Sequence, residues 1–257
     1  MTPAGELFAD QARGLLDQAR AVEAQVAELA RAPGGTLRLS LCSGYARARL
    51  VAATARWLAG RRGLRLELRL EDDPVDLAHG GVDVAVRVVP VTATDVVATR
   101  LDSYPHVLVG APRWAERARA PRHPSELAAL PCLAMRTDRA WVRWPFRRDG
   151  ELAEVQVQPC AEVNAADALV ELAEAGVGLT VLPAYLADEP LRRRRLVRLL
   201  GDWTLPLGHA YALHARRRRL PAAARDWLAE MQTAVARGRA NVSGAGSPTP
   251  GRAAPGR

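Results

Sequence analysis

The 257-residue chain is 49% hydrophobic and 25% charged, a balance typical of an ordinary globular protein with room for two modest domains. It has no run of about 18 apolar residues, and acidic residues interrupt its first segment, so the sequence predicts neither a membrane span nor a signal peptide, and we expect a cytoplasmic protein. The net charge of +8 comes from 36 basic residues that include no lysine, and this spread of arginine favours a compositional bias over a dedicated nucleic-acid surface.

Residues 1–32 predict a long helix that pairs with a second copy of the chain. Apolar residues recur at alternating steps of four and three, the seam of a coiled coil, at Phe8, Ala12, Leu15, Ala19, Val22, Val26 and Leu29. A helix of about 25 residues is roughly 40 Å long, more than a small domain covers. A surface helix packed on its own domain is the alternative, but the regular seam favours dimerisation.

The segment after Gly35 changes to a period of two. Three stretches alternate apolar and polar residues, at 36–41, 64–70 and 82–88, and each predicts a strand. Between the first two, residues 45–60 have helical spacing and end at a glycine. Because strand, helix and strand alternate, we expect a mostly parallel sheet.

A second group of elements begins near His106. It includes further strands, a helix over about 166–175, a strand at 176–183 and a return strand at 209–215. The final helix begins at Pro221, a favoured first helical position, and its apolar stripe is Ala224, Trp227, Leu228, Met231 and Val235. Residues 238–257 have no apolar periodicity and predict a disordered tail.

Several stretches, in their order along the chain, resemble a LysR-type transcriptional regulator. They are TPAGELF, the heptad helix, PGGTLRLSL, RLELRLEDDPVDLAHGGVDVAVRV, VATRLDSYPHVLVGAPRWAER, HPSELAALPCL and AGVGLTVLP. Their shared order over about residues 2–237 is the specific feature. TPAG is similar to the end of the family's winged helix-turn-helix, so we expect the DNA-binding helix to lie upstream of Met1 and this chain to reach DNA only through it.

The resemblance implies an α/β fold of the type II periplasmic-binding-protein kind. A dimerisation helix (1–32) would precede an effector-binding region (35–237), in which two α/β subdomains enclose a central cleft. Subdomain I would comprise about 35–98 and 208–237, and subdomain II about 105–203. The chain would cross between them near 95–104 and near 203–210.

Ser43 and Gly44 are the first candidates for an effector site. They follow the first strand and open its helix, at the carboxyl end of the sheet, where ligands of open α/β sheets bind and free N–H groups suit an anion. Serine is also a common N-cap. The two roles are compatible, and the resemblance favours the ligand role.

Four other polar residues are candidates for the walls of the cleft. Arg87 either reaches the cleft or lies on the polar face of an edge strand. Arg136 and Thr137 resemble positions on the wall of subdomain II, where Arg136 would pair with an anionic effector or remain a solvated surface residue. Asn164 resembles the family's polar position at the cleft and is also placed to cap the helix that follows it.

No enzyme signature accompanies these residues. The sequence lacks a GxSxG elbow and an HExxH motif, and its three widely spaced cysteines form no metal-ligand pattern, so we expect no catalytic residue, cofactor or metal. We expect a homodimer or homotetramer that senses a small anionic metabolite to control transcription. The alternative is a solute-binding protein of the same fold, against which the heptad helix and the lack of a signal peptide argue.

Overall fold

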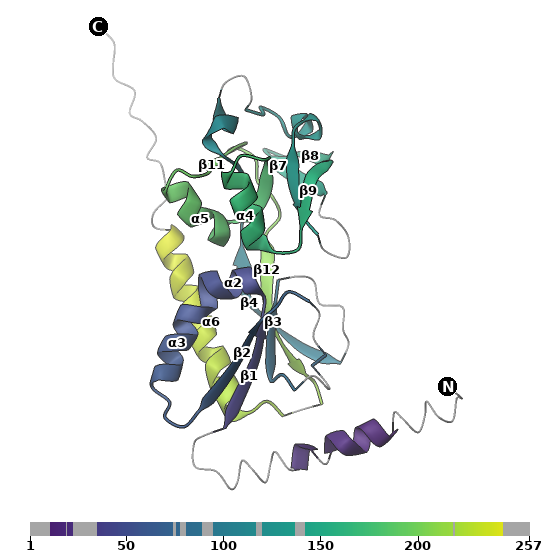
Figure 1. Ribbon diagram of the computed structural model, residues 1–257, viewed down its shortest axis with the longest axis vertical. Helices are drawn as coiled ribbons and strands as arrows, with labels where there is room; N and C mark the ends of the chain where they lie inside the picture. The colour runs from purple at the N-terminus through teal and green to yellow at the C-terminus, as the bar shows by residue number, and fades with distance from the viewer. Residues whose placement is uncertain are drawn as a thin grey trace.

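The computed structural model describes residues 11–18, 20–22, 35–73, 76–77, 81–88, 95–116, 120–136, 142–217 and 219–243. After residue 35 the chain forms two lobes, and β4 and β12 lie where the lobes meet (Figure 1). The elements follow one another as β1 (Thr36–Leu41), α2 (Ser43–Tyr45), η1 (Ala46–Leu50), α3 (Val51–Ala59), β2 (Arg65–Leu70), β3 (Val84–Arg87), β4 (Val96–Tyr104), β5 (His106–Gly110), η2 (Pro112–Ala115), η3 (Pro124–Ala129), β6 (Cys132–Met135), β7 (Arg143–Arg148), β8 (Glu151–Gln156), β9 (Pro159–Val163), α4 (Ala166–Glu174), β10 (Thr180–Pro183), α5 (Ala184–Arg192), β11 (Val197–Arg198), β12 (Gly208–Ala215) and α6 (Ala222–Ser243).

The first lobe is built on a five-stranded sheet of order β2-β1-β3-β12-β4. β1 pairs in parallel with β2 and β3, as the alternation of strands and helices predicts. β12 is antiparallel to both of its neighbours, β3 and β4. The strands β2, β1, β3 and β4 therefore all run in one direction, as expected for a mostly parallel sheet, and β12 alone runs opposite to them because it returns from the second lobe.

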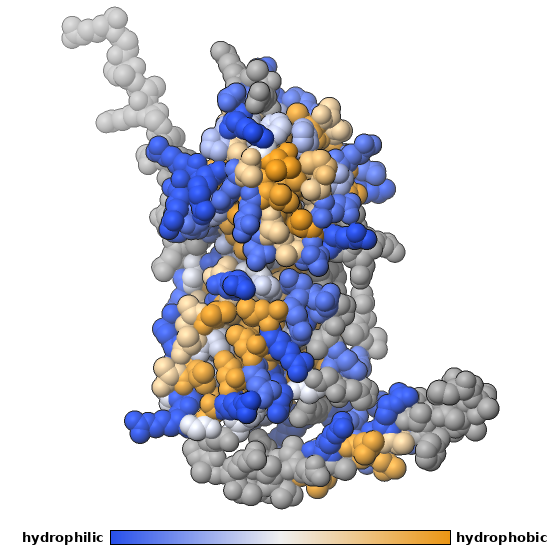
Figure 2. Space-filling view, viewed as in Figure 1, coloured by the Kyte–Doolittle hydropathy of each residue, from blue (hydrophilic) through white to orange (hydrophobic). Residues whose placement is uncertain are grey.

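The helices of the first lobe cover the sheet and share one apolar core. α2, η1 and α3 follow one another from Ser43 to Ala59, and the backbone at both junctions is right-handed helical. α6 packs beside α3, and the core between helices and sheet includes Trp57, Leu39 and Trp227. Apolar side chains reach the surface of this lobe on the side where α3 and β2 lie (Figures 1 and 2).

The second lobe is assembled from smaller sheets. β5 lies between β10 and β11, β6 pairs in parallel with β9, and β7 and β8 form a hairpin. The hairpin turns at Asp149–Gly150, where both residues have positive φ, which is the reason for an Asp-Gly pair at this point. Trp144 and Phe146 of β7 are 1% exposed and fill the core beneath the hairpin.

The described residues nearest the two termini can be compared with the predicted dimerisation helix and the predicted tail. Residues 11–18 and 20–22 are helical, and the side chains of Leu15 and Val22 are 68% and 58% exposed. Four further seam positions, Phe8, Ala19, Val26 and Leu29, lie outside the described residues. α6 continues to Ser243, so the tail does not begin at Gly238. The alanine and arginine in this stretch favour helix, and they outweigh its glycine.

Among the described residues, no helix is both long enough and apolar enough to cross a bilayer.

The packing of α6 leads to a prediction about stability. Trp227 is fully buried, and its Nε1–H donates to Thr54 Oγ1 at 3.1 Å. We expect Trp227→Ala to lower the free energy of unfolding by about 3–5 kcal/mol, because it leaves a large cavity, as measured by urea denaturation. Gln232→Ala, on the exposed face of the same helix, should change it by less than about 0.5 kcal/mol. Equal effects of the two substitutions would contradict this account of the core.

Candidate functional site

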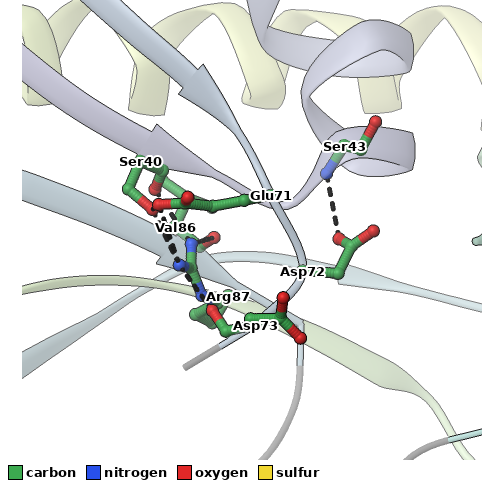
Figure 3. A network of polar contacts seen from close by, with 7 residues as sticks. All are labelled: Ser40, Ser43, Glu71, Asp72, Asp73, Val86 and Arg87. Carbon is green, nitrogen blue, oxygen red and sulfur yellow. Dashed lines mark hydrogen bonds and ion pairs between the residues drawn. The ribbon is translucent and has the colours of Figure 1, made fainter. Parts of the chain in front are cut away.

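Ser43 begins the helix that follows β1, as predicted, but it does not cap it. Cys42 occupies the N-cap position, and no side chain caps the helix start. The N–H of Ser43 donates to Asp72 Oδ1 at 3.0 Å (Figure 3). A carboxylate of the chain itself therefore lies at the helix start, where the positive end of the helix dipole favours an anion. The N–H that the sequence analysis expected to be free for an anionic effector already has a partner.

Cys42 is buried next to the same carboxylate. Burial and, next, the contact with Asp72 raise the pKa of the Cys42 thiol to about 12. It is therefore a neutral thiol at pH 7 and serves as a structural group, not as a nucleophile.

Gly44 lies directly against the second lobe. A Cβ added to Gly44 would meet the Cβ of Ala166, the first residue of α4, at 3.4 Å, and Leu186 of α5 at 3.7 Å. A larger side chain would therefore push on the second lobe at the start of α4. Gly44 is therefore a point of contact between the helix after β1 and the opposite lobe.

Asn164 and Arg136 lie beside each other on the second lobe. β6 and β9 run in parallel, with Met135 opposite Val163, and the N–H of Arg136 donates to the Val163 carbonyl at 2.6 Å. Both side chains are exposed. Asn164 does not cap α4, because Ala165 holds the N-cap position.

The start of α4 brings these residues near Gly44. Only one residue separates Asn164 from Ala166, so their Cα atoms are at most about 7 Å apart. Thr137 lies outside the described residues. The structure thus gathers Ser43, Gly44, Asn164 and Arg136 around the start of α4, without showing a ligand there.

Arg87 does not lie on an edge strand, which was one of the two positions predicted for it. β3 is the central strand of its sheet, not an edge strand, and Arg87 is only 6% exposed. Its guanidinium donates to the Ser40 carbonyl at 3.0 Å, to Ser40 Oγ at 2.7 Å and to the Asp73 carbonyl at 3.0 Å (Figure 3). The Nε–H has no partner. Arg87 therefore joins the ends of β1, β2 and β3 from inside the lobe.

Electrostatics around Arg87 are dominated by burial and by neighbouring acids. Burial lowers the pKa of Arg87, while the carboxylates of Glu71, Asp72 and Asp73 act in the opposite direction. Glu71 Oε1 accepts from Ser40 Oγ at 2.7 Å and lies 4.0 Å from the guanidinium. The guanidinium remains charged at pH 7, since arginine is not deprotonated in proteins.

The acidic segment Glu71–Asp73 is a part of the site that sequence reasoning missed. These three acids follow β2, whose carboxyl end lies beside that of β1, because the two strands are parallel and in register to Leu41 and Leu70. Glu71 continues this pairing, since its N–H donates to the Leu41 carbonyl at 3.0 Å. The sequence signal that could have indicated this part of the site is a run of three acids at the carboxyl end of a strand, the end at which ligands of α/β sheets bind.

Other features of the described residues lie apart from this junction. A surface cavity of about 280 Å³ at the turn of the β7–β8 hairpin is lined in part by Arg148, Asp149 and Thr204, and none of the six predicted effector-site residues is among its known lining. In the described part of the chain, no group of three or more His, Cys, Asp and Glu side chains could hold a metal ion.

Comparison with known proteins identifies the family. Residues 30–236 match the family model described as the LysR substrate binding domain. The chain is 27% identical over 238 residues to the HTH-type transcriptional regulator PtxR of Pseudomonas aeruginosa, with 92% of this chain and 76% of PtxR covered. It is 26% identical over 220 residues to PgrR of Escherichia coli, with 84% and 74% covered.

Solved structures of regulators have the same fold. The full-length virulence activator AphB of Vibrio cholerae superposes with a TM-score of 0.71 at 21% identity, covering 90% of this chain and 79% of AphB. The effector domain of AmpR from Pseudomonas aeruginosa gives a TM-score of 0.65 at 20% identity, covering 80% and 100%. The type II periplasmic-binding-protein-like fold that the sequence predicted is thereby confirmed. The chain belongs to the LysR family of transcriptional regulators, and residues 30–236 are its effector-binding region.

Proposed function

We propose that this chain senses its effector at the junction of the two lobes, around the start of α4. The observation that carries the proposal is the approach of Gly44 to Ala166, since a Cβ on Gly44 would lie 3.4 Å from the Ala166 Cβ. A small molecule bound between Ser43 on one lobe and Asn164 and Arg136 on the other would contact both lobes at once. Its binding energy would then depend on how the lobes are placed relative to each other.

The proposal divides the effector-binding region into two subdomains. Subdomain I comprises about 35–98 and 208–237, and subdomain II about 105–203. Effector binding changes the pose of one against the other and, through the helix at 1–32, the pose of the subunits in a dimer or tetramer. DNA recognition belongs to a helix-turn-helix and not to residues 35–237, and the protein works in the cytoplasm as a regulator of transcription.

The role proposed for Arg87 is to shape this site from behind and not to bind the effector. Its terminal nitrogens already donate to Ser40 and Asp73. By linking the ends of β1 and β2, it sets the position of the acidic segment that supplies Asp72. For Thr137, the family resemblance implies a place on the wall of subdomain II, and this stays a prediction.

The Ser43 position leads to the first prediction about binding. A thermal-shift screen against a metabolite library identifies an effector, because a ligand that binds only the folded state raises the melting temperature. We expect Ser43→Ala to weaken effector binding several-fold, consistent with losing one hydrogen bond of about 0.5–1.5 kcal/mol, and Ser43→Trp to abolish it by steric block. Isothermal calorimetry measures both.

The control for Ser43→Trp is Ser125→Trp, at an exposed serine of the second lobe. It should bind the effector as the wild-type chain does. Wild-type affinity in the folded Ser43→Trp variant would place the site elsewhere.

Because Asp72 accepts from the Ser43 N–H, a substitution of Asp72 tests whether the effector is negatively or positively charged. A carboxylate effector must displace the Asp72 carboxylate from the Ser43 N–H, whereas a cationic effector gains from that carboxylate. Since the sequence favours an anionic metabolite, we expect Asp72→Asn to strengthen binding by weakening the internal competitor. Weaker binding to Asp72→Asn, with Glu126→Gln on the second lobe unchanged as a control, would show that the effector carries a positive charge.

The exposed seam predicts self-association through the N-terminal helix. Leu15 and Val22 are seven residues apart and exposed, so both would be buried in a coiled coil with a second copy. We expect Leu15→Glu with Val22→Glu to reduce the mass measured by light scattering. Gln18→Glu with Ala21→Glu adds the same charge off the seam and should leave the mass unchanged. If both pairs of substitutions leave it unchanged, the seam does not hold the oligomer together.

A further inference from the structure

Tyr185 belongs to the second lobe, but its side chain packs against the core of the first lobe. It is the second residue of α5, yet its ring packs against the apolar core of the first lobe. The ring meets that of Tyr104 edge-on, with centroids 4.8 Å apart and planes at 85°, and that of Tyr45 at 5.3 Å and 82°. Edge-to-face pairs at these distances are favourable arrangements of aromatic rings. The three rings form a cluster to which both lobes contribute.

A cation lies against the ring of Tyr185 in this cluster. Burial raises the pKa of both Tyr185 and Tyr104, so both hydroxyls are neutral at pH 7. The Arg49 guanidinium of η1 lies 5.9 Å from the centre of the Tyr185 ring, within the range of a cation–π contact. One second-lobe side chain is therefore held by three residues of the first lobe.

Tyr104 connects this cluster with both crossings of the chain. It ends β4, where the chain leaves the first lobe, and it pairs with Gly208, where β12 re-enters it. A Cβ on Gly208 would overlap the Tyr104 ring, so only glycine fits there. Beside this pair, Ser103 Oγ and His209 Nδ1 are hydrogen-bonded at 2.9 Å. The ring of Tyr104 thus lies against the place where the two connecting strands run together.

Tyr45 links the cluster with the helix start that bears Ser43 and Gly44. It is the third residue of that helix and is fully buried. Its hydroxyl donates to Asp102 Oδ2 at 3.0 Å, and Asp102, 2% exposed, lies in β4 beside an irregularity in the pairing with β12. A displacement of the helix start therefore acts on β4 through a buried hydrogen bond and on Tyr185 through ring contact.

We propose that the Tyr45–Tyr104–Tyr185 cluster fixes the angle between the two lobes, and that a displacement at Ser43–Gly44 changes this angle through Tyr45. Lobes joined by two connections are otherwise expected to move relative to each other unless a substantial interface restrains them. The second half of the proposal rests on the effector site proposed above; the first half does not.

Distances between spin labels on the two lobes test the first half without any effector. Cys160 on the second lobe is exposed, whereas Cys42 and Cys132 are buried. Arg62→Cys, at an exposed position after α3, adds a label to the first lobe. With Tyr185 intact, we expect a narrow distance distribution by double electron–electron resonance. Tyr185→Leu should broaden it, and Tyr185→Phe, which keeps the ring, should broaden it less.

The matched control is Leu191→Ala on the same helix, which packs only against the core of the second lobe. It should leave the distribution narrow. A distribution unchanged by Tyr185→Leu in a chain with native circular dichroism overturns the proposal, and so does equal broadening by Leu191→Ala. If Tyr185→Leu does not fold, Tyr185→Met carries the test, and a distribution identical to that of the wild type then overturns the proposal.

The second half is tested with Ser43→Trp, which acts as a fixed wedge at the helix start and needs no ligand. It should shift the mean distance between the labels, and adding Tyr45→Leu should reduce that shift. An equal shift with and without Tyr45→Leu overturns the coupling through Tyr45. Because no effector is used, failure to find an effector leaves this result standing, and failure of this test leaves the effector site standing.

Discussion

The pairing of β4 with β12 is the constraint on which the rest of this structure depends. These strands carry the chain between the lobes, and their antiparallel register places Tyr104 opposite Gly208. Because both crossings are tied together in one sheet, the lobes meet at a defined place and not through two loose linkers. The contact of Gly44 with Ala166, the insertion of Tyr185 and the position of Asp102 all follow from that place.

At this place the chain supplies its own carboxylate to the helix start. Asp72 accepts from the Ser43 N–H at 3.0 Å, and it helps to raise the pKa of the buried Cys42 thiol. Helix starts attract anions because their N–H groups lack partners within the helix, and here that attraction is met inside the protein. At the proposed effector site, an anionic effector would replace the Asp72 carboxylate at the helix start. That exchange would make the acidic segment Glu71–Asp73 part of the proposed site.

The buried charge of Arg87 is likewise stabilised by groups of the chain itself. A buried guanidinium is costly unless its donors are satisfied, and its terminal nitrogens bond to three acceptors from Ser40 and Asp73. These bonds bind the carboxyl ends of three neighbouring strands to one side chain. The strand ends near Arg87 are therefore held in shape by long-range polar contacts, while a face of the sheet relies on apolar packing against α3 and α6.

The sequence by itself determined the elements and the family. Alternation at 36–41 and 64–70 and the stripe of Trp227, Met231 and Val235 depend on neighbours only a few residues away, and such local patterns can be read directly. Tertiary structure alone decided the antiparallel entry of β12, the interior place of Arg87 and the partner of Ser43. Each joins segments far apart in the chain: Asp72 is 29 residues from Ser43, and Arg87 is 47 from Ser40. No local period encodes which distant strand end will lie beside a helix start, because that is settled by sheet order, and sheet order by the packing of the whole lobe.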